Sequence, residues 1–476
     1  MTKVSPIVTP SISSSLSLES PTNHRRVSTS SVQSLASVIA SAASSVSSIP
    51  FSGEPEVVKA EGFTQNIIET DNLDPCSWSG LVLTLILFAF NAHTSFVLQL
   101  RQYKKPSFLL QLLECIRALK VPSWHSPSIT PEQLKIHKVS GSLTNAVFFV
   151  SCPSVNEALT ILLRIYGPSS GSLISRPREL HTLHILSSRY NLGPKVYGTF
   201  ENGRMEEYFP SKTLTAQDMR DPQISRWIGA RMAELHSVPI DVIEETSPGS
   251  GGEGTGWQLG AKKNVWSWLA SAKDVLMHPN IPQSVREEFD LDRFQHQWES
   301  YIQWLSGVDD VHNGSRRVFA HNDTQYGNLL RLEGVEVRAP HRQLIVVDFE
   351  YASPNPASFD IANHFLEWTY NYHTSTPHLP DESRYPTPQE RENFYLSYLE
   401  HTGTSSADRL AQQAKGLEKQ VRYWTPACHA MWCMWGIVQA TDDVINNVTE
   451  PEFDYIGYSR FRMLAFRRSV AALGII

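Results

Sequence analysis

The chain has 476 residues, which is too many for one compact core and fits two or three domains or lobes. Its 41% hydrophobic and 19% charged residues are typical of a globular protein. A net charge of −7 without a basic stripe argues against a nucleic-acid partner. The five cysteines form no metal-ligand pattern, and such a sparse, odd count indicates reduced thiols in the cytoplasm.

Residues 1–62 predict a disordered tail, because 17 of the first 50 residues are serine and too little apolar surface is present to offset the entropy of ordering. No secretory signal is recognisable. A mitochondrial presequence is the rival interpretation, supported by Arg25 and Arg26 but opposed by Glu19 and by the lack of an amphipathic Arg-rich helix. The same arginines precede Ser28 in a pattern typical of basophilic kinase sites.

Residues 78–100 form the most apolar stretch of the chain, within a segment that we place at 63–128. Its length makes it a candidate membrane span, but Asn91, His93 and Gln99 interrupt the apolar run and make a span the weaker interpretation. An insertion at about 79–101 and an ordinary buried helix or strand remain the alternatives. An amphipathic helix is expected to follow at 107–119.

From residue 129 the pattern becomes that of a folded domain. Residues 129–209 predict strands and one helix, and residues 210–476 predict mainly helices. The strands are expected at 134–139, 146–151, 159–166, 196–200 and 204–209, and the helix at 177–190. Strands return briefly at 318–320 and 344–349.

The strongest motif is His321-Asn322-Asp323, followed by Asn328 five residues after the aspartate. It repeats the spacing H-x-D-x-x-x-x-N of the protein-kinase catalytic loop, in which Asp accepts the substrate hydroxyl proton and Asn binds Mg²⁺. Asp348-Phe349-Glu350 follows at the end of an apolar strand, where such enzymes carry a metal-binding aspartate. The two motifs in this order predict phosphoryl transfer.

The residues from Asp348 through Asn355 to Asp360 and on to Trp368 resemble the signature of choline/ethanolamine kinases, relatives of the aminoglycoside phosphotransferases. The resemblance covers about residues 129–466. It implies an α+β, protein-kinase-like fold of two lobes, with a small antiparallel sheet-rich N-lobe, a larger mainly helical C-lobe and ATP in the cleft between them.

The resemblance also implies roles for single residues. Asp323 is the expected catalytic base, Asn328 and Asp348 are the expected Mg²⁺ ligands, and Glu350 is a further candidate ligand. Asp360 opens the helix after the signature, where a cap and a role in the site both stay open.

The first lobe offers candidates for binding the nucleotide. The turn from Ser140 to Asn145, which includes Gly141, Ser142 and Thr144, lies between two expected strands and could hold phosphates with its backbone amides, although it has a single glycine. The family resemblance assigns the phosphate-contacting cation to Arg164, partnered by Glu179. It also assigns the adenine-binding hinge to the residues around Glu207 and Phe209.

The acceptor site is predicted from aromatic and acidic residues, because a quaternary ammonium has no N–H to donate and is recognised by ring faces and diffuse negative charge. Trp432 and Trp435 lie on one face of an expected helix, where plain core packing is the alternative to a binding role. In the family, such residues and Glu367 surround the choline. The further candidates for contacts with the acceptor are Gln325, Glu350, Tyr351, Phe453 and Tyr458.

These residues predict a soluble, cytoplasmic choline kinase that uses ATP and Mg²⁺ to make phosphocholine, the first step of phosphatidylcholine synthesis by the CDP-choline route. Ethanolamine kinase, or a kinase of both amino alcohols, is the nearest alternative. An inactive scaffold is the alternative from another class, and the intact Asp323, Asn328 and Asp348 argue against it. The sequence leaves a homodimer open.

Overall fold

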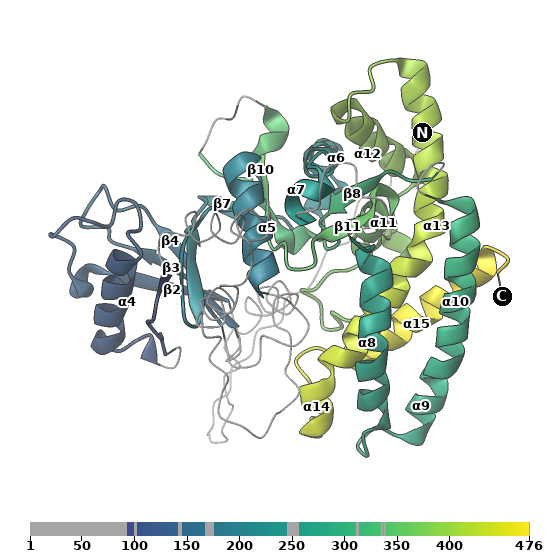
Figure 1. Ribbon diagram of the computed structural model, residues 1–476, viewed down its shortest axis with the longest axis horizontal. Coiled ribbons are helices and arrows are strands. Elements are labelled where there is room, and N and C mark those ends of the chain that lie inside the picture. The colour runs from purple at the N-terminus through teal and green to yellow at the C-terminus, as the bar shows by residue number, and fades with distance from the viewer. Residues whose placement is uncertain are drawn as a thin grey trace, which may run out of the picture.

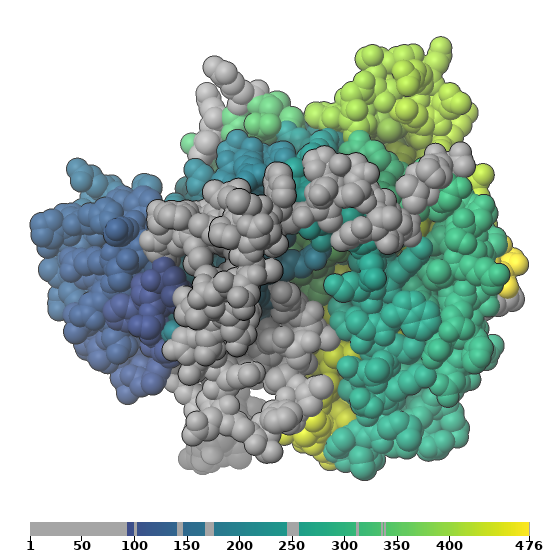
Figure 2. Space-filling model, viewed as in Figure 1, coloured from purple at the N-terminus to yellow at the C-terminus, as the bar shows by residue number. Residues whose placement is uncertain are grey.

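A computed structural model describes residues 93–99, 102–140, 145–166, 176–244, 257–310, 314–334, 337 and 339–475. The predicted tail, Ser28 and the apolar run at 81–90 lie outside these residues. The described chain forms a smaller N-lobe and a larger C-lobe, which Figure 2 shows as two masses side by side.

The N-lobe is built on a six-stranded sheet with the strand order β1-β5-β6-β4-β3-β2. All neighbouring pairs are antiparallel except β1 and β5, which run parallel. The helix α5 (Arg176–Arg189) lies on the side of the sheet that faces the C-lobe (Figure 1). The strands are β1 (His93–Thr94), β2 (Lys135–Ser140), β3 (Asn145–Ser151), β4 (Ile161–Tyr166), β5 (Val196–Phe200) and β6 (Gly203–Glu207).

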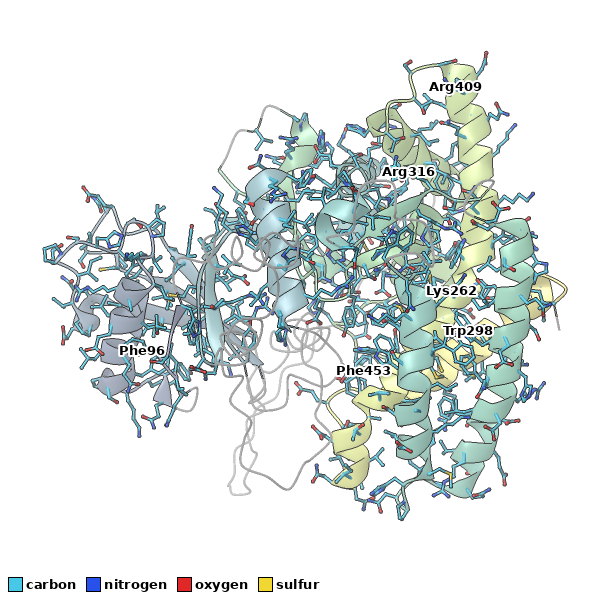
Figure 3. All side chains as sticks on the ribbon, viewed as in Figure 1. Phe96, Lys262, Trp298, Arg316, Arg409 and Phe453 are labelled. Carbon is cyan, nitrogen blue, oxygen red and sulfur yellow. The ribbon has the colours of Figure 1, made fainter. Side chains whose placement is uncertain are left out.

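Residues 93–99, the described end of the apolar stretch, belong to this lobe. The backbone N–H of Leu98 donates to Asn202 Oδ1 at 3.0 Å, and Asn202 Nδ2 returns a bond to the Leu98 carbonyl at 2.9 Å. The Leu98 side chain is fully buried in the N-lobe core, and Figure 3 shows Phe96 in the same lobe. These contacts place residues 93–99 in the folded N-lobe, and the insertion at about 79–101 stays a prediction.

The predicted amphipathic helix is present as α4 (Pro106–Ala118), which packs its apolar face into the same core as Leu98. Within the described ranges, no helix is long and apolar enough to cross a membrane.

The chain crosses to the C-lobe directly after β6. It enters a three-stranded sheet, ordered β10-β9-β7, that lies between the two lobes. A separate pair of strands, β8 and β11, runs antiparallel within the C-lobe. The strands are β7 (Ser211–Thr213), β8 (Arg317–Ala320), β9 (Leu329–Leu332), β10 (Leu344–Val346) and β11 (Ser353–Pro356).

The rest of the C-lobe is helical, as the sequence predicts. The long helix α13 packs against α15, α8 and α11, and the labelled Trp298 on α10 lies in the core between these helices (Figure 3). The helices are α6 (Pro222–Leu235), α7 (Ile240–Glu244), α8 (Gly260–Met277), α9 (Gln283–Phe289), α10 (Leu291–Val308), α11 (Ala357–Glu367), α12 (Pro388–His401), α13 (Ala407–Gln439), α14 (Thr441–Ile445) and α15 (Tyr455–Ala472).

Candidate active site

The predicted catalytic motif forms the turn between β8 and β9, where the two lobes meet. Asn328 Nδ2 donates to the backbone carbonyl of Asp323 at 2.9 Å and to Asp323 Oδ2 at 2.8 Å. Both side chains are buried. These two bonds fix the orientation of the Asp323 carboxylate, so its second oxygen keeps acceptor capacity for a substrate hydroxyl.

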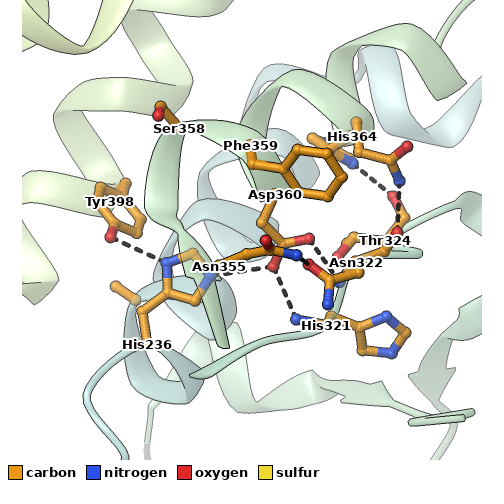
Figure 4. Close-up of polar contacts among 12 residues, drawn as sticks. His236, His321, Asn322, Thr324, Asn355, Ser358, Phe359, Asp360, His364 and Tyr398 are labelled. Carbon is orange, nitrogen blue, oxygen red and sulfur yellow. Dashed lines mark hydrogen bonds and ion pairs between the residues drawn. The ribbon is translucent and has the colours of Figure 1, made fainter. Parts of the chain in front are cut away.

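Asp360 on α11 holds the backbone of this turn. Its Oδ2 accepts from the His321 N–H at 2.9 Å and its Oδ1 accepts from the Asn322 N–H at 2.8 Å. Asn322 has a φ of 67°, a left-handed conformation that costs free energy for a residue with a Cβ. Asp360 is therefore no helix cap: its carboxylate compensates for the strained backbone beside Asp323 (Figure 4).

A buried histidine supports Asp360 from behind. His236 Nε2 donates to Asp360 Oδ2 at 3.0 Å, and His236 Nδ1 lies 3.0 Å from the Tyr398 hydroxyl (Figure 4). Burial acts to raise the pKa of Asp360, but the bonds from His236 and His321 outweigh it and hold this pKa below its ordinary value. Asp360 thus stays ionised and can accept from both backbone amides.

Asp323 has the opposite electrostatic environment. Burial raises its pKa well above the ordinary value, and the nearby negative charges of Glu367 and Asp348 raise it further. The bond from Asn328 only partly offsets this effect. A carboxylate with a raised pKa is a stronger base, which suits the removal of a hydroxyl proton near neutral pH.

The predicted metal ligands lie beside this turn. Asp348 follows β10 in a left-handed conformation, with a φ of 68°. Its pKa and that of Glu350 are raised, in both cases first by burial. Among nearby charges, Asp348 is the largest one that raises the pKa of Glu350. These two buried carboxylates provide negative charge that a divalent cation would neutralise.

The donor set fits magnesium bound together with a nucleotide. Neither carboxylate oxygen of Glu350 accepts a hydrogen bond from the described residues, although Arg176 Nη1 lies 3.7 Å from Oε2. In the same part of the chain, no group of three or more Asp, Glu, His or Cys side chains could hold a metal alone. Mg²⁺ is usually bound by one or two carboxylates, with substrate phosphates and waters completing its octahedron, which matches Asp348, Asn328 and Glu350.

A cleft of about 180 Å³ lies between the lobes next to Asp348. The predicted nucleotide residues Arg164, Glu179, Glu207 and Phe209 all line it. Phe149 and Tyr208 line the cleft and pack edge to face, with their ring centres 4.7 Å apart. Such rings offer the apolar contacts that an adenine ring needs. Strands β2 and β3 flank the predicted phosphate turn, whose residues 141–144 lie outside the described ranges.

The expected pair of Arg164 and Glu179 is replaced by other contacts. Glu179 Oε1 accepts from Arg204 Nη1 at 2.9 Å, and Oε2 accepts from Arg176 Nη1 at 2.6 Å. Arg164 acts on Glu179 only from farther away, as the third cation that lowers its pKa. The Arg164 guanidinium is therefore directed to the cleft by β4 without being tied to Glu179, where it can contact an anionic phosphate.

Four of the predicted acceptor residues, Tyr351, Trp432, Trp435 and Tyr458, meet in one aromatic cluster, which Tyr455 completes. Neighbouring rings are 5.3–5.9 Å apart and meet edge to face. Phe453 extends this cluster through Tyr458, and Figure 3 shows it at the start of α15.

Both tryptophans are fixed by their indole N–H groups. Trp432 Nε1 donates to Asn363 Oδ1 at 2.7 Å, and Trp435 Nε1 donates to the Tyr351 hydroxyl at 2.8 Å. Asn363 in turn donates to the Asn322 carbonyl at 3.1 Å, so helix α11 connects the aromatic cluster to the catalytic turn.

Glu367, the last residue of α11, is paired at the edge of the cluster. Its Oε1 accepts from Arg462 Nη2 at 3.1 Å and its Oε2 accepts from the Tyr372 hydroxyl at 2.6 Å. Burial raises the pKa of Glu367, and these two partners only partly counteract it. Since Glu367 is also the charge that most raises the pKa of Asp323, the two acids lie close together.

Some predicted and observed roles differ. Gln325 Oε1 accepts from the Gly327 N–H at 3.0 Å and caps the short turn that carries Asn328, so the structure gives it a role within the loop. The sequence-based prediction missed His236, Arg204 and Arg462. Arg462 lies one helical turn after Tyr458, so helical spacing from that predicted residue was a signal that places Arg462 beside the acceptor site.

Comparisons with known proteins agree with this geometry. The sequence model of the choline/ethanolamine kinase family matches residues 136–467. A choline kinase of Schizosaccharomyces pombe is 34% identical, over 78% of this chain and 90% of its own length. A choline/ethanolamine kinase of Homo sapiens is 32% identical, over 70% of this chain and 80% of its own length.

Among solved structures, a choline kinase of Cryptosporidium parvum aligns with a TM-score of 0.58 at 24% identity. The alignment covers 77% of this chain and 97% of that one, and it confirms the two-lobed, protein-kinase-like α+β fold. The predicted phosphotransferase activity on an alcohol, with ATP as the phosphate donor, is likewise supported at the level of the family. The chain belongs to the choline/ethanolamine kinase family.

Proposed function

We propose that this chain is a choline kinase, which transfers the γ-phosphate of ATP to the hydroxyl of choline. The observation that carries the proposal is the position of α11. One end of this helix holds the catalytic turn through Asp360, and residues on the same helix contact Trp432 and Arg462 in and beside the aromatic cluster. A choline whose ammonium contacts the cluster therefore has its hydroxyl within reach of Asp323.

The reaction needs one base and one in-line displacement. The hydroxyl oxygen of the acceptor forms a bond to the γ-phosphorus, while the bond from that phosphorus to the β–γ bridging oxygen breaks and ADP leaves. The hydroxyl proton passes to the carboxylate of Asp323, which Asn328 holds in place. A cation next to Glu367 offsets the charge that most raises the pKa of Asp323, so binding of the acceptor favours the ionised base.

The residues of this chain would hold Mg²⁺ through Asp348, Asn328 and Glu350. When bound, the ion neutralises charge on the phosphates and the leaving group. Arg164 contributes a permanent positive charge to the cleft, and the hinge at Glu207 and Phe209, which also lines it, is where adenine would bind. Since the metal ligands, Arg164 and the hinge bind the nucleotide, the role left to Asp323 is the transfer of the hydroxyl proton.

Choline suits the cluster better than a smaller primary amine does. Four pairs of neighbouring rings in the cluster have their centres within 6 Å of each other and present faces and edges to a ligand. Each cation–π contact with a desolvated quaternary ammonium contributes about 0.5–2 kcal/mol to binding. The two tryptophans also pack in the core, so packing and binding are roles of the same rings.

We also propose a cytoplasmic location. The four cysteines within the described part of the chain are buried and unpaired, as is usual for proteins kept in a reducing compartment. Fractionation of cells that express the full chain, with detection of the protein in the cytosolic fraction, tests this proposal.

A kinase assay with choline and ethanolamine side by side tests the proposed function. The full chain is incubated with Mg²⁺-ATP and each acceptor, and ADP and the phosphorylated acceptor are quantified. We expect phosphocholine at a higher kcat/KM than phosphoethanolamine, and loss of both products when Mg²⁺ is chelated. A chain that phosphorylates neither acceptor contradicts the proposal, and a preference for ethanolamine replaces choline with ethanolamine.

A further inference from the structure

Beside the aromatic cluster, the acceptor atoms of Glu367, Asn363 and Tyr351 already receive hydrogen bonds from the protein. Both Glu367 oxygens are engaged, one by Arg462 and the other by Tyr372. Asn363 Oδ1 accepts from Trp432, and the Tyr351 hydroxyl accepts from Trp435. All of these side chains are buried, so no bulk water competes for the bonds.

Arg462 is held next to Glu367 by two aromatic rings and by its burial. Its guanidinium carbon lies 4.7 Å from the centre of the Tyr370 ring and 5.0 Å from that of Tyr458. The side chain is fully buried, which keeps it next to its carboxylate partner, Glu367. A cation that is covalently part of the chain thus offsets part of the charge of Glu367 before any acceptor binds.

Ethanolamine and choline differ in the number of hydrogen-bond donors on their ammonium groups. The ammonium of ethanolamine carries three N–H donors, and burying a donor without a partner costs binding free energy. The trimethylammonium of choline has no donor and needs only ring faces and apolar contacts. A wall whose acceptors are occupied therefore penalises ethanolamine and leaves choline unaffected.

We propose that Tyr372, Arg462, Trp432 and Trp435 determine the specificity of this enzyme by occupying the hydrogen-bond acceptors of its substrate site. The inference rests on the proposed function and deepens it. Tyr372 and Arg462 act through Glu367, whereas the two tryptophans present their rings to the acceptor and use their N–H groups to occupy Asn363 and Tyr351.

Tyr372→Phe tests the inference because it keeps the ring and frees Glu367 Oε2 for an ammonium N–H. We expect the ratio of kcat/KM for choline to that for ethanolamine to fall about three- to tenfold, chiefly through a lower KM for ethanolamine. The KM for ATP should stay within about twofold of the wild type. Trp435→Phe frees the Tyr351 hydroxyl by an independent route and is expected to lower the same ratio.

Tyr395→Phe is the matched control. The Tyr395 hydroxyl also donates to a glutamate, Glu418 Oε2 at 2.9 Å, but this pair connects α12 to α13 away from the aromatic cluster. The substitution is chemically identical and should leave the ratio unchanged. Melting temperatures of all three variants show whether each one folds.

The outcomes separate this inference from the proposed function. A wild-type chain that phosphorylates neither acceptor overturns the proposed function and the inference with it. An active wild-type chain whose ratio is unchanged in both Tyr372→Phe and Trp435→Phe overturns the inference alone. An equal fall in Tyr395→Phe also overturns it, because the effect would then follow from loss of any such bond. If Tyr372→Phe does not fold, the Trp435→Phe result decides.

Discussion

The nucleotide side and the acceptor side of this site both bury a glutamate, but they stabilise it in different ways. Glu179 on the nucleotide side binds two arginines, and its pKa is lowered to about 2 although burial acts to raise it. Glu367 on the acceptor side binds one arginine and one tyrosine, and its pKa stays raised. Burial raises the pKa of both glutamates and cations lower it, so the number of cations that pair with each carboxylate determines the direction of the net shift.

This difference matches what each side has to bind. The proposed nucleotide side would receive a polyanion, and there Arg204 and Arg176 pair with Glu179, so the positive charge of Arg164 is not directly paired with that glutamate. The proposed acceptor side would receive a cation, and there Arg462 is held by Glu367 and two rings. Excess positive charge on the nucleotide side is complementary to the phosphates of ATP, and aromatic surface on the acceptor side is complementary to the cation of choline.

The largest effect is expected at Asp323, where the two sides meet. Asp323→Ala should lower kcat about 10²–10⁴-fold, because general base catalysis typically contributes that much. Folding should change little, since Asn328 Nδ2 keeps its bond to the backbone carbonyl of residue 323. Steady-state kinetics and a thermal melt check both points, and a variant that keeps a tenth of the wild-type kcat would remove Asp323 from the role of base.

A pair of glutamate substitutions tests the comparison directly. Glu179→Gln leaves two buried arginines without their shared anion and should lower the free energy of unfolding by about 3–5 kcal/mol. Glu367→Gln removes a carboxylate that burial already disfavours, so the loss should be smaller, about 1–3 kcal/mol. Urea unfolding measures both, and equal losses would show that the two sides do not differ.

The sequence predicted most of this site because its motifs combine chemistry with spacing. Asp323, Asn328 and Asp348 were recognisable from order and separation alone, and the structure places them around one turn. The partners of the buried charges were not recognisable, because Arg204 contacts Glu179 across 25 residues and Arg462 contacts Glu367 across 95. Such pairs depend on the packing of whole strands and helices, which no local pattern records.

The same limit explains the differences in the N-lobe. The composition of the apolar stretch predicted an insertion, and it gave no sign that its described end, residues 93–99, pairs with β5 and bonds to Asn202 at the edge of the sheet. Helix α4 was predicted to within one residue at each end because its apolar spacing is local. The spacing of apolar residues was therefore a better guide than their number.

Acid should affect the two glutamates with opposite signs. The pKa of Glu179 is about 2 in the fold and about 4.3 in an unfolded chain, so its contribution is present above pH 4.3 and is lost as the pH falls towards 2. This amounts to about 3 kcal/mol. Glu367 has a raised pKa, so its contribution to stability is present below the unfolded value and is lost as the pH rises through the folded one.

The stability difference between wild type and Glu179→Gln should therefore shrink by about 3 kcal/mol between pH 5 and pH 2. Glu367→Gln should show no such shrinkage over the same range. Urea midpoints at several pH values provide the measurement. A difference for Glu179→Gln that does not depend on pH would mean that this carboxylate is not ionised in the fold.

The smallest effect, at Tyr370, is expected in a comparison of two tyrosines that each lie beside an arginine. Tyr166 and Tyr370 have a guanidinium carbon 4.7 Å from their ring centres, of Arg176 and Arg462 respectively. The Tyr166 hydroxyl also accepts from Arg204 Nη1 at 2.7 Å, whereas the buried Tyr370 hydroxyl makes no hydrogen bond with the described residues. Replacement by Phe keeps each ring, so the two variants differ only in the hydroxyl that is lost.

Tyr166→Phe should lower the free energy of unfolding by about 1.5–3 kcal/mol, the usual contribution of a hydrogen bond to a charged group. Tyr370→Phe should change it by less than about 0.5 kcal/mol, because its ring alone faces the arginine. Chemical denaturation of both variants measures the difference. A large loss of unfolding free energy in Tyr370→Phe would show that the Tyr370 hydroxyl has a hydrogen-bond partner in solution. Arg462 on the acceptor side would then be stabilised by hydrogen bonds, like the arginines on the nucleotide side, and not mainly by aromatic faces.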